Sequence, residues 1–119
     1  FRFLTMPILI ITTNATKTAF SKESAVLALS KVVANVTSKP ESYVNVVINT
    51  DAIMSFGGSA DLCAFVELQS IGFRNSKGDT VKTITEAVVE HLKIPQDRFY
   101  VKLTDLSPKE VGFNGNTFA

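Results

Sequence analysis

The pair Met6-Pro7 stands directly before the apolar stretch 8–12 and is the part of this sequence best suited to chemistry. Proline donates no ladder hydrogen bond, but it is tolerated as the first residue of a strand. If translation starts at Met6 and the methionine is removed, the nitrogen of Pro7 becomes a secondary amine. An α-amino group has a pKa of about 7.7–8.0, and burial lowers it. The Pro7 nitrogen would then titrate near neutral pH, where a general base works best.

A simpler interpretation is that Pro7 only begins a strand. The segment Phe1-Arg2-Phe3-Leu4-Thr5 precedes Met6, and while it is attached the Pro7 nitrogen is an amide without basicity. The segment is too short for a signal peptide and has no small-residue cleavage site. Either residues 1–6 are an extension that the functional chain does not carry, or they are natural and the amine chemistry is absent. Residues 7–119 are expected to form a single domain.

The composition argues against a nucleic-acid-binding protein, a membrane-spanning protein and a metal site. The chain has 119 residues, of which 45% are apolar, and a net charge of +1. This charge gives no electrostatic argument for binding nucleic acid, and no apolar run approaches the ~20 residues that span a bilayer. Cys63 is the one cysteine, which fits a reducing compartment. His91 lacks a second metal ligand and Gly57-Gly58 lacks the lysine of a phosphate loop, so we expect no metal and no cofactor.

The first half of the chain is typical of a βαβ unit. The apolar stretch 8–12 predicts a strand buried on both faces. Ser21 is a candidate N-cap, and apolar residues then recur at helical spacing as far as Val36. This helix should end before Lys39-Pro40, because the residue before proline is disfavoured in a helix. Residues 43–49 are rich in β-branched and aromatic side chains and predict a second strand, parallel to the first.

The second half repeats this plan. Residues 63–70 predict a strand, Asp79 or Thr80 is the expected cap of a second helix, and 99–103 predict a final strand. We therefore predict an α+β fold of two layers, in which duplicated βαβ units form a four-stranded mixed sheet with both helices on one face. The other face would be bare and partly apolar, and two layers need mutual burial. The sequence thus predicts an oligomer.

The last residues, 111–119, predict a small hairpin. Asn114-Gly115 lies between two short β-prone pieces, and both residue types accept the positive φ of a tight hairpin turn. An apolar tail with its own turn is expected to dock, for example on a neighbouring subunit. The alternative is a frayed terminus.

Several segments in register along the chain resemble the macrophage migration inhibitory factor family, which includes D-dopachrome tautomerase. They are Met6-Pro7, Thr13-Asn14, Ser38-Lys39-Pro40-Glu41-Ser42-Tyr43-Val44, Met54-Ser55-Phe56-Gly57-Gly58-Ser59, Ser70-Ile71-Gly72, Ile94-Pro95-Gln96-Asp97-Arg98-Phe99-Tyr100 and Gly112-Phe113-Asn114-Gly115-Asn116-Thr117-Phe118. The resemblance implies a homotrimer around a barrel-like core. It also implies a cofactor-independent keto–enol tautomerase that acts on phenylpyruvate-type aryl keto acids or dopachrome-type compounds.

The resemblance further implies the residues of the site. Pro7 matches the catalytic N-terminal proline, and Lys39 matches the lysine that binds the substrate carboxylate. Ser70 and Ile71 match the segment whose backbone donates a hydrogen bond to the ligand. The apolar walls would be Tyr43, Tyr100, Val111, Phe113 and Phe118, with Tyr100 coming from the adjacent subunit. Without the family, Lys39 is an ordinary lysine at a helix C-terminus, and such aromatic residues are more often core than ligand wall.

Three positions differ from the family pattern. Cys63 is followed three residues later by Val66, so a dithiol redox role cannot be carried over. Lys102 stands at the pocket rim where an asparagine is familiar, and Phe113 where a tryptophan is familiar. An added cation would favour acidic substrates, and a smaller aromatic ring would widen the mouth of the pocket.

Two alternatives to an active enzyme remain. The first is a cytokine-like protein that binds a CD74-type or chemokine-type receptor, located in the cytoplasm and secreted without a signal peptide. Lys17 and Asp51 match the family's charged receptor-contact loops, although on sequence alone they are solvated charges. The second is a catalytically silent trimer whose pocket is filled by Phe1, Phe3 and Leu4.

Overall fold

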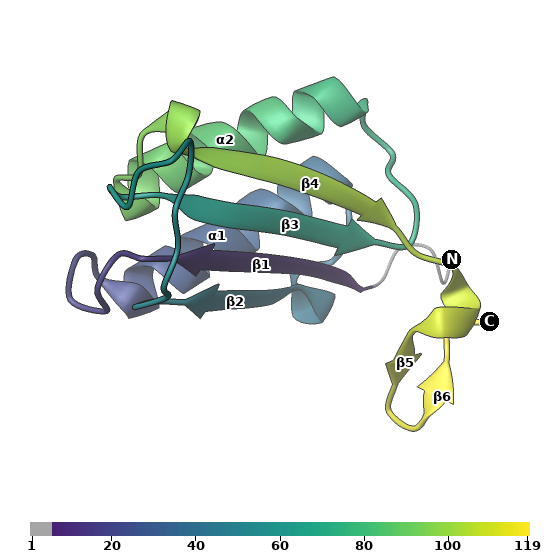
Figure 1. Cartoon of the computed structure of the whole chain (residues 1–119). Helices are drawn as coiled ribbons and strands as arrows, with labels where there is room; N and C mark the ends of the chain where they lie inside the picture. The colour runs from purple at the N-terminus through teal and green to yellow at the C-terminus, as the bar shows by residue number, and fades with distance from the viewer. Residues whose placement is uncertain (1–5) are drawn as a thin grey trace.

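A four-stranded sheet forms one layer of the protein, and two helices form the other (Figure 1). The computed structural model describes residues 6–119. The sheet has the order β2-β1-β3-β4. Its strands are β2 (Asn45–Asn49), β1 (Pro7–Thr13), β3 (Ala64–Ser70) and β4 (Phe99–Asp105). The helices are α1 (Lys22–Thr37) and α2 (Lys77–Leu92).

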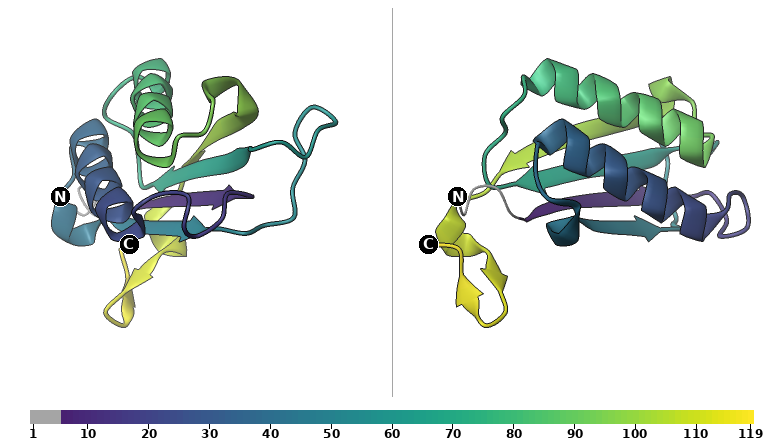
Figure 2. Two further views of the ribbon diagram at one scale, coloured as in Figure 1. Left: turned by 90° about the vertical axis from the view of Figure 1, so that its left-hand side faces the viewer. Right: turned by 180° about the vertical axis from the view of Figure 1, so that it is seen from behind.

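The strand pairing confirms the duplicated βαβ plan and the α+β class. β1 is parallel to β2, β3 is parallel to β4, and the two halves join through the antiparallel pair β1 and β3. Both helices cover the same face of the sheet, as the view from behind in Figure 2 shows. This follows from the handedness of β-α-β crossovers, because two crossovers of the same hand around this sheet place their helices on one side.

The core lies between the helices and one face of the sheet. Alternate residues of each interior strand point toward the helices, so β1 and β3 bury every second side chain. The fully buried large side chains of this layer are Leu9, Ile11, Leu29, Val33, Val66, Leu68, Ile84, Val88 and Leu92. The spacing of the helix residues among them is the helical period seen in the sequence.

The other face of the sheet has no layer over it within residues 6–119. Val47, Phe65 and Tyr100 are 37%, 40% and 71% exposed on that face. Ile8 and Ile10 of β1 are only half-buried there. The prediction that the first strand is buried on both faces is therefore wrong for the single chain, because both helices lie on the same side.

Two predicted element starts are wrong by two residues or more. The second strand begins at Asn45 and not at Tyr43, because Glu41–Tyr43 form a single 3₁₀ turn, η2, after Pro40. α2 begins at Lys77, where the Ser76 hydroxyl caps the helix by accepting the Asp79 N–H at 3.1 Å. Asp79 and Thr80 thus lie inside the first turn of the helix. Serine, threonine and aspartate are all favoured N-caps, so the residue types near position 77 do not show which one caps the helix.

Arg98 holds the long connection between β2 and β3. It lies in a second 3₁₀ turn, η3 (Gln96–Arg98), before β4. Its guanidinium donates to four backbone carbonyl oxygens of this connection, those of Phe56, Ser59, Asp61 and Leu62. The planar fork of arginine suits such multiple donation. The clamp fixes a loop that contains the tight turn Phe56–Ser59.

The predicted hairpin is present at the end of the chain. A third 3₁₀ turn, η4 (Pro108–Glu110), leads into β5 (Gly112–Phe113) and β6 (Asn116–Thr117). Asn114 and Gly115 have φ of 53° and 85°, as the tight turn requires. The hairpin projects away from the sheet, near the end where β1 begins (Figure 1). Neither long helix within residues 6–119 has the length and apolar character to cross a membrane.

Candidate functional site

Pro7 is the first residue of an interior strand. It is buried, and in the antiparallel pairing of β1 with β3 it lies opposite Ser70. Proline is accepted here because the first position of a strand needs no ladder donor at that nitrogen. The strand pairing therefore fixes the Pro7 nitrogen at one end of the sheet, beside the end of β3.

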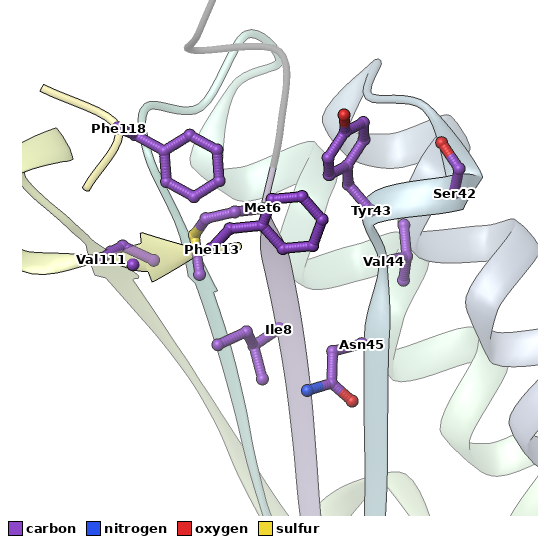
Figure 3. A pocket seen from close by; sticks show the side chains of 10 residues that line it. Met6, Ile8, Ser42, Tyr43, Val44, Asn45, Val111, Phe113 and Phe118 are labelled. Carbon is purple, nitrogen blue, oxygen red and sulfur yellow. The ribbon is translucent and has the colours of Figure 1, made fainter. Parts of the chain in front are cut away.

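An apolar cavity of about 290 Å³ lies at this end of the sheet. Figure 3 shows its lining side chains, which come from the start of β1, the approach to β2 and the C-terminal hairpin. They are Met6, Ile8, Ser42, Tyr43, Val44, Asn45, Val111, Gly112, Phe113 and Phe118. Three segments that are far apart in the sequence thus meet beside Pro7.

Aromatic rings make one wall of this cavity. The ring of Tyr43 meets that of Phe113 edge to face, with centroids 5.4 Å apart. Phe113 also stacks on Phe118, at 6.3 Å with an interplanar angle of 13°. Aromatic pairs at these separations attract one another beyond their buried area. The hairpin is therefore attached to the sheet through the wall that a flat, apolar ligand would contact.

Lys39 is brought to the same end of the sheet by the end of α1. Ser38 adopts the left-handed conformation, and the Lys39 N–H bonds back to the Ala34 carbonyl, which closes the helix and turns the chain. The Lys39 side chain is 5% exposed, and its Nζ donates to the Ile71 carbonyl oxygen at 2.8 Å. Burial lowers the pKa of Lys39 from its ordinary 10.5, and so does the Arg74 cation. The Asp105 carboxylate opposes both effects.

The turn after β3 is hydrogen-bonded to the end of β4 and to the end of α1. The Leu106 N–H donates to the Ser70 carbonyl at 2.8 Å, and the Gly72 N–H donates to Asp105 Oδ1 at 3.0 Å. Asn75 Nδ2 donates to the Val36 carbonyl near the end of α1. The Ser70 hydroxyl is fully buried and makes no hydrogen bond within residues 6–119.

The structure brings together most of the residues named from the sequence. Among the expected wall residues, Tyr43, Val111, Phe113 and Phe118 line the cavity. Pro7 itself does not line the cavity, although its neighbours Met6 and Ile8 do. Lys39, Ser70 and Ile71 do not line it either; Ser70 pairs with Pro7, and Lys39 contacts the carbonyl of Ile71, the next residue.

Tyr100 and Lys102 lie on β4, away from the cavity of this chain. Both are exposed, and the Tyr100 ring lies 5.1 Å from that of Phe56. The role of Tyr100 in a neighbouring subunit's pocket and the place of Lys102 at a pocket rim both stay predictions. The prediction that Phe1, Phe3 and Leu4 fill the pocket concerns residues outside the described range.

Six lining residues were not predicted as site residues from the sequence: Met6, Ile8, Ser42, Val44, Asn45 and Gly112. Met6 is 5% exposed, and its side chain lines the same cavity as Phe113 (Figure 3). Ile8 and Asn45 face the cavity because the parallel register pairs them. Alternation along β1 places Ile8 on the face opposite Pro7, so no signal in the sequence identifies Ile8, and Asn45 required the register.

The arrangement suits an organic anion with a flat apolar body. A buried lysine amine contacts the backbone turn that follows Ser70, the partner of Pro7, and aromatic rings line the cavity at the same end of the sheet. Residues 6–119 contain no group of three or more His, Cys, Asp or Glu side chains arranged to hold a metal ion. The chemistry that these residues themselves offer is binding of a carboxylate by Lys39 and, where its nitrogen is an amine, proton transfer at Pro7.

Comparison with known proteins gives a consistent result over nearly the whole chain. The model of the macrophage migration inhibitory factor family matches residues 6–119. A macrophage migration inhibitory factor homolog of Brugia malayi is 37% identical over 115 residues, covering 95% of this chain and 99% of that protein. A homolog of Trichinella spiralis is 39% identical over 117 residues, covering 95% and 100%.

Solved structures of the same family also superpose on this chain. The macrophage migration inhibitory factor of Trichinella spiralis superposes with a TM-score of 0.87 at 37% identity, covering 92% of this chain and 98% of that one. A homologue from Prochlorococcus marinus gives a TM-score of 0.84 at 28% identity, covering 94% and 99%.

Proposed function

The chain belongs to the macrophage migration inhibitory factor family, and from this we propose that it is a cofactor-independent keto–enol tautomerase of aryl keto acids. Membership of this family supports an activity of the tautomerase kind. The observation that carries the specific proposal is the position of Pro7. This buried residue begins β1 opposite Ser70, its chain neighbours Met6 and Ile8 line the aromatic cavity, and Lys39 contacts the residue that follows Ser70.

In the proposed mechanism the Pro7 nitrogen is the base. With Pro7 as the chain terminus, its neutral amine takes a proton from the carbon next to the ketone, and the resulting ammonium returns that proton to the other end of the enol system. Lys39 holds the substrate carboxylate by a charge-assisted hydrogen bond, and a backbone N–H of the Ser70-Ile71 segment adds a second donor. The Lys39 cation also lowers the pKa of the Pro7 amine by like-charge repulsion.

Met6 affects both the Pro7 nitrogen and the cavity. Its side chain lines the cavity, and its carbonyl makes the Pro7 nitrogen an amide. Removal of the chain up to and including Met6 would therefore free the base and enlarge the space beside the aromatic wall. The first change makes the nitrogen a base, and the second gives an aryl keto acid room to reach it.

A homotrimer is part of this proposal. The uncovered face of the sheet carries Val47, Phe65 and Tyr100, which a partner would bury. Packing three such faces together would make a barrel-like core. Tyr100 would then contribute to the pocket of the neighbouring subunit, and the isolated monomer would be inactive.

A second candidate function is binding of a CD74-type or chemokine-type receptor, with secretion by a route that needs no signal peptide. One contact favours it. The backbone N–H of Lys17 donates to Asp51 Oδ2 at 3.2 Å, so the two charged loops that match the family's receptor contacts lie together. In this case the pocket would be secondary.

The test compares two forms of the chain, one that starts at Pro7 and one that keeps residues 1–6. We expect phenylpyruvate tautomerisation only by the short form, with both forms shown to be trimers by analytical ultracentrifugation. Absence of turnover in both folded trimers would favour receptor binding. Equal turnover in both, with residues 1–6 shown by mass spectrometry to be intact, would show that Pro7 is not the base.

A further inference from the structure

A single peptide group joins an acidic and a basic side chain at the end of the sheet. The carbonyl oxygen of Ile71 and the N–H of Gly72 belong to the same planar unit. Lys39 Nζ donates to that oxygen at 2.8 Å, and Asp105 Oδ1 accepts from that N–H at 3.0 Å. In a trans peptide the oxygen and hydrogen point in opposite directions, so the two charges approach the peptide from opposite sides.

The orientation of this peptide depends on both side chains. Gly72 has φ of 77°, a conformation that glycine adopts without strain. Rotating the peptide would break both hydrogen bonds at once. The preceding carbonyl, that of Ser70, is held separately by the Leu106 N–H. The end of β4 therefore fixes the whole turn after β3, and with it the backbone beside Lys39.

The charges reinforce one another through the peptide. A positive donor on the oxygen and a negative acceptor on the N–H both polarise the amide in the same sense, which strengthens each hydrogen bond. Burial and the Arg74 cation both disfavour the charged form of Lys39, and Asp105 is the group that favours it. A terminal amine at Pro7, when protonated, would add to the repulsion.

We propose that Asp105 is a positioning residue, which orients the Ile71–Gly72 peptide and supports, with its negative charge, the Lys39 ammonium that would bind a carboxylate. This inference rests on the proposed function, because it concerns the lysine that would receive the substrate. Asp105 does not touch the substrate. It acts from the last position of β4, in register with Ser70, the last position of β3.

The first experiment needs no turnover. In the full chain, the pKa of the Lys39 ammonium is measured by NMR for the unchanged protein and for Asp105→Asn. The asparagine carbonyl can still accept the Gly72 N–H, so only the charge is removed. We expect a Lys39 pKa lower by about half a unit or more. Arg74→Gln should move the pKa in the opposite direction. An unchanged Lys39 pKa in Asp105→Asn would overturn the proposal.

The matched control is Asp97→Asn. Asp97 is an exposed carboxylate in η3, before the opposite end of β4. The same chemical change there should leave the Lys39 pKa as it is. Asp105→Ala removes the acceptor as well, so the Gly72 amide should exchange faster with solvent than in Asp105→Asn. Equal exchange rates in these two variants would contradict the orienting role.

Kinetics in the chain that starts at Pro7 complete the test. At a pH where the NMR titration shows the Lys39 ammonium of Asp105→Asn to be mostly deprotonated, this variant should raise KM for an aryl keto acid several-fold and change kcat much less. KM for the methyl ester of the same acid should stay the same, since the ester carries no charge for Lys39. Absence of turnover in the unchanged chain would reject the proposed function while leaving the NMR test of Asp105 valid. Equal changes for acid and ester would overturn the role of Asp105 in carboxylate binding.

Discussion

The Nζ atom of Lys39 lies 2.8 Å from the carbonyl oxygen of Ile71, a residue 32 positions further along the chain. This contact joins the end of α1 to the end of β3, and Ser70 in turn pairs with Pro7. A cation, a backbone turn and the first residue of β1 are thereby held at one place. The hydrogen bond to the Ile71 carbonyl explains why the side chain of Lys39, although it follows a helix end, is buried.

Replacing Pro7 by glycine, in the chain that starts at residue 7, should remove most of the turnover of phenylpyruvate. Glycine supplies a primary and more mobile amine in place of the ring nitrogen, so the base is no longer fixed. General bases contribute about 10²–10⁴-fold to rate, and we expect kcat/KM to fall within this range. Steady-state kinetics measure it, and circular dichroism checks the fold. Unchanged turnover would exclude Pro7 as the base.

The pH dependence of substrate binding should report on Lys39. Its pKa is below the ordinary 10.5. As the pH rises through that lowered pKa the ammonium loses its charge, so KM for a keto acid should begin to rise below pH 10.5. In Lys39→Arg, whose cation stays charged, this rise should be displaced to higher pH. KM measured from about pH 7 to 10 tests the sign, and a rise for the methyl ester as well would assign it to another group.

Truncating Phe113 to alanine should weaken binding with little loss of stability. Phe113 is 56% exposed, yet it contacts both Tyr43 and Phe118 in the cavity wall. Each aromatic pair contributes about 0.5–1.5 kcal/mol. We expect KM for an aryl keto acid to rise several-fold in the chain starting at Pro7. Leu27→Ala, at a 64% exposed position on α1, is the control, and an equal effect there would contradict the assignment.

The two helix caps should respond differently to the same substitution. Ser76 caps α2 with its hydroxyl, whereas Ser21, the N-cap of α1, makes no side-chain cap hydrogen bond within residues 6–119. Ser76→Ala should therefore lower the free energy of unfolding by about 0.5–2 kcal/mol, and Ser21→Ala by much less. Urea denaturation at one fixed protein concentration measures both, because oligomers unfold in a concentration-dependent way. Equal losses would show that the hydroxyl contact at Ser76 contributes no stability.

Local patterns determined the secondary structure. The helical spacing in 25–36, the β-branched run before Asn49 and the Asn114-Gly115 turn each predict an element that is present. These features depend on backbone conformation and on side chains a few positions apart, which the sequence displays directly. The resemblance to the family, carried by motifs in register along the chain, predicted that Pro7, Lys39 and the aromatic wall belong to one site.

The tertiary structure decided which residues meet. The parallel register brings Asn45 beside Ile8, and the end of β4 brings Asp105 to Gly72. Neither contact has a local signature, since each depends on how strands far apart in the sequence align. The cap of α2 is Ser76 because its hydroxyl, among several suitable residues, reaches a free N–H of the first turn. The sequence by itself thus determined the elements and the family, while the packing of those elements lowered the pKa of Lys39 and formed the walls of the cavity.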